Sequence, residues 1–165
     1  MASEKQLAIA SVKNLVENGY YQQQMKRALG DNAGSFATSI MEVVTNDSAL
    51  LQCDPSALMQ EAMKAASLKL PVNKQLGYAY LLPFRDNKKG IMVPTLIIGY
   101  KGYIQLAIRS GIYKSINADI VYEGELQGYD KLSGLVSLDG ERKSDKVVGY
   151  FAYFDINGFK KTWYM

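Results

Sequence analysis

The chain has 165 residues, of which 48% are hydrophobic and 21% are charged, proportions typical of a globular protein rather than a disordered one. Its single cysteine, Cys53, excludes an internal disulfide, and the absence of histidine argues against a zinc site. No run of about 18 apolar residues occurs, and the N-terminus lacks the pattern of a signal peptide, so we expect a cytoplasmic protein without a membrane span.

Three helices are predicted in the first part of the chain. The first covers residues 4–28, with a break near Gly19, and the second begins at Ser35. The third has the clearest start signal, because Asp54 is a typical N-cap residue and Pro55 is favoured at the first helical position. Amphipathic helices are most often scaffold, so we interpret these as scaffold or subunit contacts.

Cys53 lies beside the start of the third helix. A thiol at a helix N-terminus can have a lowered pKa and be reactive. A buried, inert cysteine is the more common situation, and we favour that interpretation.

Two apolar strands and a short helix follow. The strands are predicted at residues 78–84 and 92–100, joined by a basic turn at residues 85–90. The spacing of apolar residues predicts a helix over residues 101–110. Gly111 closes it, since glycine is the residue expected just past a helix end.

The first of these strands is rich in aromatic and aliphatic residues. Successive side chains of a strand point to opposite faces, so one face is predicted to carry Tyr78, Tyr80, Leu82 and Phe84. We expect most of this face to be buried.

Nearly all the excess positive charge lies in this part of the chain. From Lys69 to Lys114 there are eight basic residues and one acidic residue, a net charge of +7, whereas the segments on either side carry −2 each. The basic residues are Lys69, Lys74, Arg85, Lys88, Lys89, Lys101, Arg109 and Lys114. Tyrosines and a phenylalanine are interleaved with them. Cations for phosphates and aromatic faces for unstacked bases are what a groove for flexible nucleic acid requires.

The predicted helix has one polar side. Lys101, Gln105 and Arg109 recur at every fourth position, which places them in a single stripe. Tyr103 and Ile104 lie on the other side, and we expect both to belong to the core. An ordinary amphipathic helix with a solvated edge is the alternative to a phosphate-binding one.

The N-terminus of this helix is a second candidate for phosphate binding. It lies at Tyr100, Lys101 and Gly102, where backbone N–H groups without helical partners attract anions. Gly99 and Gly102 would leave room for a phosphate backbone to approach closely.

After this helix the pattern changes to that of strands. Residues 115–122 alternate between apolar and polar side chains, which indicates a half-buried strand. Residues 123–146 are rich in Gly, Asp and Lys and should form short strands and exposed loop. Residues 146–156 form a strong strand, and Asn157-Gly158 predicts a tight hairpin to a last strand at residues 159–165. The whole order predicts an α+β fold, in which N-terminal helices precede an antiparallel β-sheet with a β-β-α-β core.

Groups suited to catalysis are few. There is no histidine for acid–base chemistry near neutral pH and no GxxxxGK[ST] loop for ATP. Six acidic residues could in principle assemble a metal-dependent nuclease site: Asp119, Glu123, Glu125, Asp130, Asp139 and Glu141. Spaced through turns as they are, they are more typical of a solvated face. We therefore expect no enzyme, no bound metal and no cofactor.

Four segments have a more specific pattern: LKLP at residues 68–71, GYAYLLPF at 77–84, LIIGYKG at 96–102 and AIRSG at 107–111. In order and spacing they resemble the RecT family of phage recombinases, which are single-strand DNA annealing proteins. The resemblance runs from about Asp54 to about Glu123, weakens after that and returns faintly near the end of the chain. Family members continue into a further C-terminal segment.

The resemblance implies ATP-independent annealing of complementary strands in DNA recombination and repair, by oligomeric rings or filaments that hold DNA in a basic groove. It implies as partners single-stranded DNA, the annealed duplex, further copies of the chain and a partner exonuclease, within the cytoplasm of a bacterial host. The predicted DNA-binding residues are Lys69, Lys74, Arg85, Lys88, Lys89, Tyr100, Lys101, Gly102, Gln105, Arg109 and Lys114. A metal-dependent nuclease and a non-catalytic partner-binding module remain the alternatives.

On this interpretation the chain divides in two. Residues 1–53 form a helical segment that makes oligomer contacts, and residues 54–165 form the DNA-annealing α+β core. The last strand runs to Met165 without an element to cover it, and an exposed strand edge invites pairing. We expect either truncation of the core at its C-terminus or a second copy that covers this edge.

Overall fold

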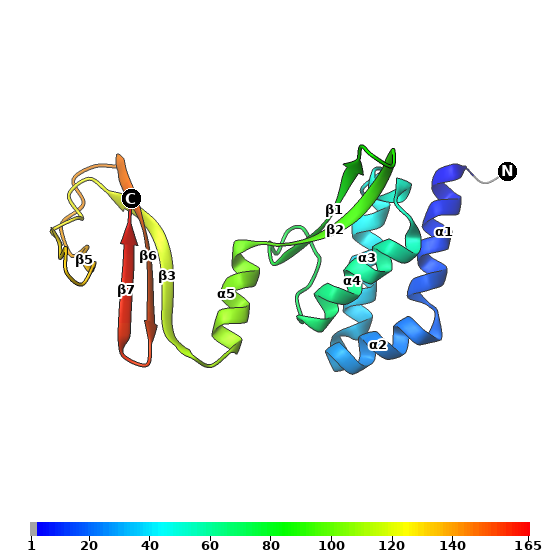
Figure 1. Ribbon diagram of the computed structural model, residues 1–165, viewed down its shortest axis with the longest axis horizontal. Helices are drawn as coiled ribbons and strands as arrows, with labels where there is room; N and C mark the ends of the chain where they lie inside the picture. Colours follow the sequence, from blue (N-terminus) through cyan, green and yellow to red (C-terminus); the bar gives the residue numbers. More distant parts are fainter. Residues whose placement is uncertain (1–2) are drawn as a thin grey trace. The chain divides into compact units, whose positions relative to one another are not determined.

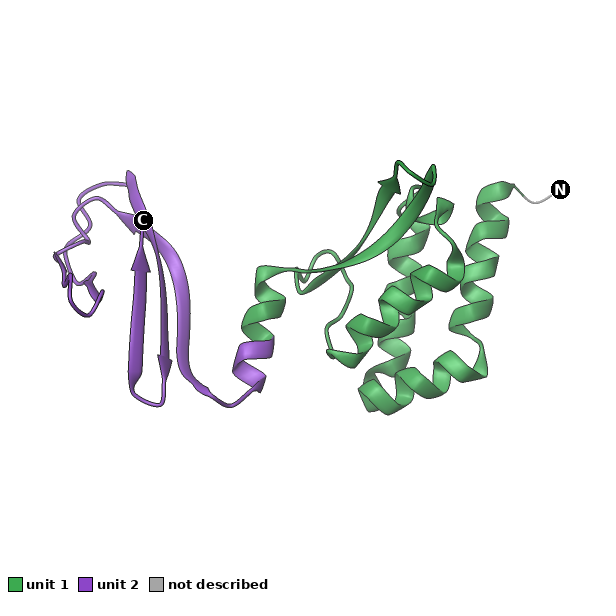
Figure 2. Ribbon diagram, viewed as in Figure 1, with its two compact units in different colours: residues 1–105 green, residues 106–165 purple. Residues whose placement is uncertain are grey.

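The computed structural model describes residues 3–165 and divides into two compact units, residues 1–105 and residues 106–165 (Figure 2). The first unit holds the N-terminal helices and a β-hairpin, and the second holds the other strands, β3 to β7 (Figure 1). The α+β class and the order of two strands, a helix and a strand are confirmed. The functional division at residues 53 and 54 stays a prediction.

Short polar residues start the helices of the first unit. Helix α1 (Glu4–Val16) begins with a capping box, in which the Ser3 hydroxyl accepts from the N–H of Gln6 and the Gln6 side chain accepts from the N–H of Ser3. Helix α2 (Gly19–Leu29) is capped by Asn18, whose side chain accepts from the N–H of Tyr20 at 2.9 Å. The break expected near Gly19 is therefore confirmed.

Helix α3 (Ala33–Thr45) starts two residues earlier than predicted, because a 3-10 turn, η1 (Gly30–Asn32), leads directly into it. A second 3-10 turn, η2 (Leu50–Gln52), precedes α4 (Pro55–Ser67). As predicted, Asp54 caps α4 through a 2.8 Å hydrogen bond from the N–H of Ala57, with Pro55 at the first position.

The core of the first unit lies between the helices and a hairpin of β1 (Ala79–Asp86) and β2 (Ile91–Ile98), which α4 contacts. Its fully buried side chains include Met25, Ile40, Leu58 and Met59. Burying such side chains contributes roughly 1.5–3 kcal/mol each, which makes this helical layer a firm support for the hairpin.

The buried face of β1 is the opposite of the one expected. Ala79 and Leu81 are fully buried, whereas Phe84 is 50% exposed and Tyr80 is half-buried. Both faces of the strand are apolar, so alternation alone could not select the one that meets the core.

Helix α5 (Tyr100–Arg109) follows the hairpin and ends as predicted, with Gly111 in the left-handed region at a φ of 70°. In the second unit, β3 (Tyr113–Tyr122), β6 (Val147–Ile156) and β7 (Phe159–Tyr164) pair antiparallel in the order β3-β6-β7. Short strands β4 (Gly128–Tyr129) and β5 (Val136–Ser137) form a separate pair within the predicted loop.

The hairpin between β6 and β7 is formed as expected. Asn157 and Gly158 both have positive φ, 51° and 90°, as a two-residue type I′ turn requires. Within residues 3–165 the strands pair into three separate sheets, β1–β2, β3-β6-β7 and β4–β5, rather than into the single sheet expected. Helix α5 interrupts the strand order between the first two sheets.

Candidate nucleic-acid interface

Lys69 follows the C-terminus of α4 in the left-handed backbone region, with a φ of 53°. Its N–H donates to the carbonyl of Ala66 at 2.9 Å, and the N–H of Leu70 donates to the carbonyl of Ala65 at 3.0 Å. This pair of bonds is a Schellman motif, which ends the helix and usually has glycine at the position of Lys69. The motif holds an exposed lysine at the surface beside α4.

Lys74 lies in the loop between α4 and β1 and pairs with Asp47, with 3.0 Å between Nζ and Oδ2. Burial alone would raise the pKa of the Asp47 carboxyl. The hydrogen bonds from Lys74, Leu50 and Ala49, with the charge of Lys74, outweigh burial and lower this pKa. The charge of Lys74 is partly neutralised within the protein, and its contact with DNA stays a prediction.

Three cations are exposed where β1 leads into the turn before β2: Arg85 in β1, and Lys88 and Lys89 in the turn. The Oδ1 atom of Asp86 accepts hydrogen bonds from the N–H groups of Lys88 at 2.9 Å and Lys89 at 3.2 Å. Gly90, at a φ of 69°, donates its N–H to the carbonyl of Asp86 at 2.7 Å. The turn is therefore held by its own hydrogen bonds, with Lys88 and Lys89 in it and Arg85 near the end of β1. We call these three residues the turn group.

The first turn of α5 exposes two aromatic rings. Tyr100 is 71% exposed and Tyr103 is 60% exposed, and their spacing of three residues makes them neighbours on the helix surface. The expectation that Tyr103 belongs to the core is wrong. The sequence did carry a signal for the exposure of Tyr103. Its spacing of three residues places it on the same side of the helix as Tyr100.

The polar stripe of α5 is partly covered. Lys101 and Arg109 are exposed, while Gln105 between them is half-buried. We call Tyr100, Lys101 and Tyr103 the helix group, because they lie together in the first turn of α5 within the first unit. Contacts of the stripe with DNA stay a prediction.

The space expected beside Gly99 and Gly102 is occupied by the chain itself. A β-carbon on Gly102 would overlap the carbonyl oxygen of Tyr78, and one on Gly99 would overlap that of Gly77. The N–H of Gly102 donates to the carbonyl of Gly99 at 2.9 Å. These glycines let α5 pack closely against residues 77 and 78, so we leave Gly102 out of the interface that we propose.

The turn group and the helix group lie at opposite ends of the hairpin. The pairing runs from Ala79 opposite Ile98, next to α5, to Asp86 opposite Ile91, next to the turn. Seven steps along a strand, at about 3.4 Å each, separate the turn group from the helix group by about 24 Å. The hairpin therefore carries positive charge at both ends. Lys114 is exposed at the start of β3, in the second unit.

Two of the six acidic residues considered for a nuclease site, Asp130 and Asp139, form hydrogen bonds with nearby residues of the chain. Asp130 accepts hydrogen bonds from the Ser133 hydroxyl at 2.6 Å and from the N–H of Leu132 at 2.9 Å. The Ser133 hydroxyl is the main cause that lowers the pKa of Asp130, as the Ser137 hydroxyl is for Asp139. Among residues 3–165, no three His, Cys, Asp or Glu side chains gather where they could hold a metal ion.

Cys53 is buried, with 5% of its surface exposed, and its Sγ lies 3.7 Å from the carbonyl oxygen of Ala49. Burial, together with the charge of Asp47, raises the pKa of its thiol. The expectation that Cys53 is buried is confirmed. In the same described range, no helix has the length and hydrophobicity needed to cross a bilayer.

A family model and a known relative of this chain carry the same family name, RecT. The model of a family described as RecT family matches residues 34–165. An uncharacterized protein of Bacillus subtilis (strain 168), YqaK, is 41% identical over 157 residues, which are 94% of this chain and 53% of that protein. Protein RecT of Escherichia coli (strain K12) is 42% identical over 79 residues, which are 47% of this chain and 29% of that protein. The chain thus spans about half the length of the first relative, and the match to the second covers less than a third of that protein.

Proposed function

The chain belongs to the RecT family, and we propose that it binds single-stranded DNA and anneals complementary strands without ATP during homologous recombination. The family match over residues 34–165 carries this proposal, since that range includes the hairpin, its basic turn and all of α5. The resemblance to the same family, seen first in four short segments of the sequence, supports it.

The proposed contacts are with the DNA backbone. Annealing must work on any pair of complementary sequences, so phosphate contacts should dominate over readout of base edges. The turn group and the helix group supply exposed cations for this purpose. Neutralised phosphates would let two strands approach without their full mutual repulsion.

The exposed rings of the helix group have a separate role in this proposal. Tyr100 and Tyr103 offer flat surfaces on which unpaired bases can stack, a contact that accepts any base. A strand whose bases stack on protein is held open for pairing. Lys101, in the same turn of α5, would hold the phosphates of that strand.

Self-association is a further part of the proposal. Strand β7 is at an edge of its sheet, and Phe159 and Trp163 on it are more than half exposed. Such an edge favours pairing with another chain. Copies placed side by side would join weak contacts of single subunits into tight binding along a strand. The proposal also includes a partner exonuclease that produces the single strands. Both proteins would act in the cytoplasm of a bacterial host.

Binding of a labelled oligothymidine at several salt concentrations tests this proposal. We expect steep weakening with salt, because each phosphate contact contributes roughly −0.7 to the log–log slope. Lys101→Ala and Arg109→Ala should each reduce affinity and flatten this slope, whereas Lys5→Ala, an exposed charge on α1, should change neither. Affinity that does not depend on salt would contradict the electrostatic interface.

The two alternative functions, a metal-dependent nuclease and a non-catalytic partner-binding module, have their own tests. Cleavage of a labelled oligonucleotide that requires magnesium would favour the nuclease. The absence of any DNA binding, together with capture of a defined protein partner, would favour the partner-binding module.

A further inference from the structure

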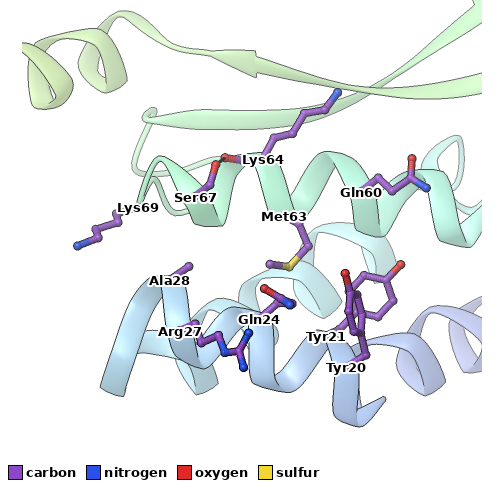
Figure 3. A pocket seen from close by; sticks show the side chains of 10 residues that line it. All are labelled: Tyr20, Tyr21, Gln24, Arg27, Ala28, Gln60, Met63, Lys64, Ser67 and Lys69. Carbon is purple, nitrogen blue, oxygen red and sulfur yellow. Dashed lines mark hydrogen bonds between the residues drawn. The ribbon is translucent and has the colours of Figure 1, made fainter.

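A groove of about 830 Å³ lies between α2 and α4 (Figure 3). Its α2 side carries Tyr20, Tyr21, Gln24, Arg27 and Ala28. Its α4 side carries Gln60, Met63, Lys64 and Ser67, and Lys69 lies just past the end of that helix. The two helices contact each other in the fold.

Helix periodicity explains why these residues line one groove. Tyr20, Gln24 and Arg27 are spaced by four and three residues, so they share one face of α2. Gln60, Met63 and Ser67 have the same kind of spacing on α4. The groove is therefore the meeting of two helix faces that are about 40 residues apart in the sequence.

The chemistry of the lining is both cationic and aromatic. Among the described residues, this lining includes three basic ones and no Asp or Glu. Lys64 pairs with Glu61, and its ammonium group points away from α2 (Figure 3). The other two basic residues of the lining are Arg27 and Lys69. Arg27 is exposed and has no ion-pair partner within residues 3–165.

The aromatic end of the groove offers a flat surface. Tyr20 is 65% exposed, and its ring meets that of Tyr21 edge to face, with 5.4 Å between centroids. This contact supports the Tyr20 ring from one side. Figure 3 shows the two tyrosines at one end of the groove and Lys69 at the other.

The backbone of Lys69 adds an independent observation. Its left-handed conformation is strained for a residue with a side chain, and glycine would occupy this Schellman position with less strain. Strain of this kind is concentrated at binding sites. A lysine at this position places an ammonium group beside the groove, which glycine could not do.

A second groove continues from the first. It has a volume of about 640 Å³ and shares Arg27, Ala28 and Lys69 with the α2–α4 groove. In the part of the chain that the structure describes, Arg27 and Lys69 are its only charged lining residues, and Phe36 and Leu76 contribute apolar surface. The two cations therefore stand at the junction of two grooves, which is where a chain of phosphates that passes from one to the other would meet them.

We propose that the α2–α4 groove is a binding site for single-stranded DNA, in which Arg27 and Lys69 hold phosphates and a base stacks on Tyr20. The inference rests on the proposed function, because it assigns the same ligand, single-stranded DNA, to a second surface of the first unit. Amide groups of Gln24 and Gln60 on the two walls can hydrogen-bond to any base. The site would hold a DNA strand on a surface additional to the hairpin.

Binding of labelled oligothymidine to variants of the 165-residue chain tests this site. Tyr20→Ala should lower affinity at least about fivefold, the effect of losing one base stack, and Tyr20→Phe should restore it. Arg27→Ala should lower affinity and reduce the salt slope by about 0.7. Lys26→Ala is the matched control, since it removes an equal charge from the next position of α2, which is not part of the α2–α4 groove.

Photocrosslinking places the strand directly. An oligonucleotide that carries 5-iodouracil should give a cross-link to Tyr20 or Tyr21, identified by mass spectrometry of peptides. Melting temperatures of the variants should match the parent, because Tyr20 and Arg27 are exposed.

The outcomes separate this site from the proposed function. If the parent binds DNA but Tyr20→Ala and Arg27→Ala bind as tightly as Lys26→Ala, and α2 gives no cross-link, the groove is not a DNA site while the proposed function stands. A parent chain that binds no oligothymidine contradicts both. Binding of polyglutamate in the groove, without competition by oligothymidine, would overturn the site in favour of an acidic protein partner.

Discussion

The carbonyl oxygen of Tyr78 occupies the place that a β-carbon on Gly102 would need. The Cγ2 atom of Ile98 would lie 2.9 Å from the same carbon. The N–H of Gly99 also donates to the Tyr78 carbonyl, at 2.9 Å. The start of α5 is thus fixed to the segment before β1, and glycine is required there by packing within the protein.

Gly102→Ala should therefore destabilise the first unit. Excess volume in a packed site typically costs about 1–3 kcal/mol, and here the obstacle is backbone, which moves less easily than a side chain. Gly34→Ala is the control, because Gly34 lies in α3 with nothing within 4 Å of an added β-carbon. That change should be neutral or stabilise by about 0.4–1 kcal/mol. Urea unfolding measures both, and equal stability of the two variants would contradict the packing.

The buried face of β1 gives a second prediction. Leu81→Ala should cost about 2–5 kcal/mol, because the side chain is fully buried in the core. Phe84→Ala, three residues along the same strand, should cost much less, because half of its surface is exposed. Denaturant midpoints of the two variants compare them directly. The reverse order would mean that the aromatic face of the strand meets the core.

Lys69 should show a conflict between stability and binding. Lys69→Gly removes the strain of a left-handed residue and should stabilise the chain by about 1 kcal/mol. The same change should weaken the binding of single-stranded DNA. Lys69→Ala is the control, since it removes the charge but keeps the strained backbone, so it should lose affinity without gaining stability. A gain in stability from both variants would show that the conformation is not strained.

The ion pair of Asp47 and Lys74 predicts a dependence on pH. The pKa of Asp47 is lower in the folded chain than its ordinary value of 3.8, so its contribution to stability is present above pH 3.8 and is lost as pH falls through the folded value. Asp47→Asn should therefore destabilise the chain at pH 7, by less than about 1 kcal/mol, and have little effect near pH 2. Urea unfolding across this range measures the difference. In a Lys74→Met background the same substitution should show a smaller dependence on pH.

Local signals in the sequence predicted most of the elements. Asp54 and Pro55 marked the start of α4, and Asn157-Gly158 marked the last hairpin, because caps and tight turns depend on a few adjacent residues. The turn group could be recognised for the same reason. All of its members lie within residues 85–89, and their charge is visible without knowledge of the fold.

The rest depended on tertiary contacts that a single sequence does not reveal. Whether Leu81 or Phe84 faces the core is decided by the helices that pack on the hairpin. Gly102 was interpreted as space for a ligand because nothing local indicates that residues 77 and 78 return to fill it. The α2–α4 groove could not be predicted for the same reason, since Arg27 and Lys69 line one groove only when the helices pack.

The central claim is that this chain anneals DNA, and the direct measurement is the rate at which two complementary labelled oligonucleotides pair in its presence. The expected result is faster pairing than without protein, unchanged by ATP or by removal of magnesium, and weakened by high salt. Replacing the turn-group lysines Lys88 and Lys89 with alanine should slow this pairing while leaving stability almost unchanged, since both are exposed. Pairing no faster than the uncatalysed rate, under conditions in which the chain is folded and bound to single-stranded DNA, would contradict the claim.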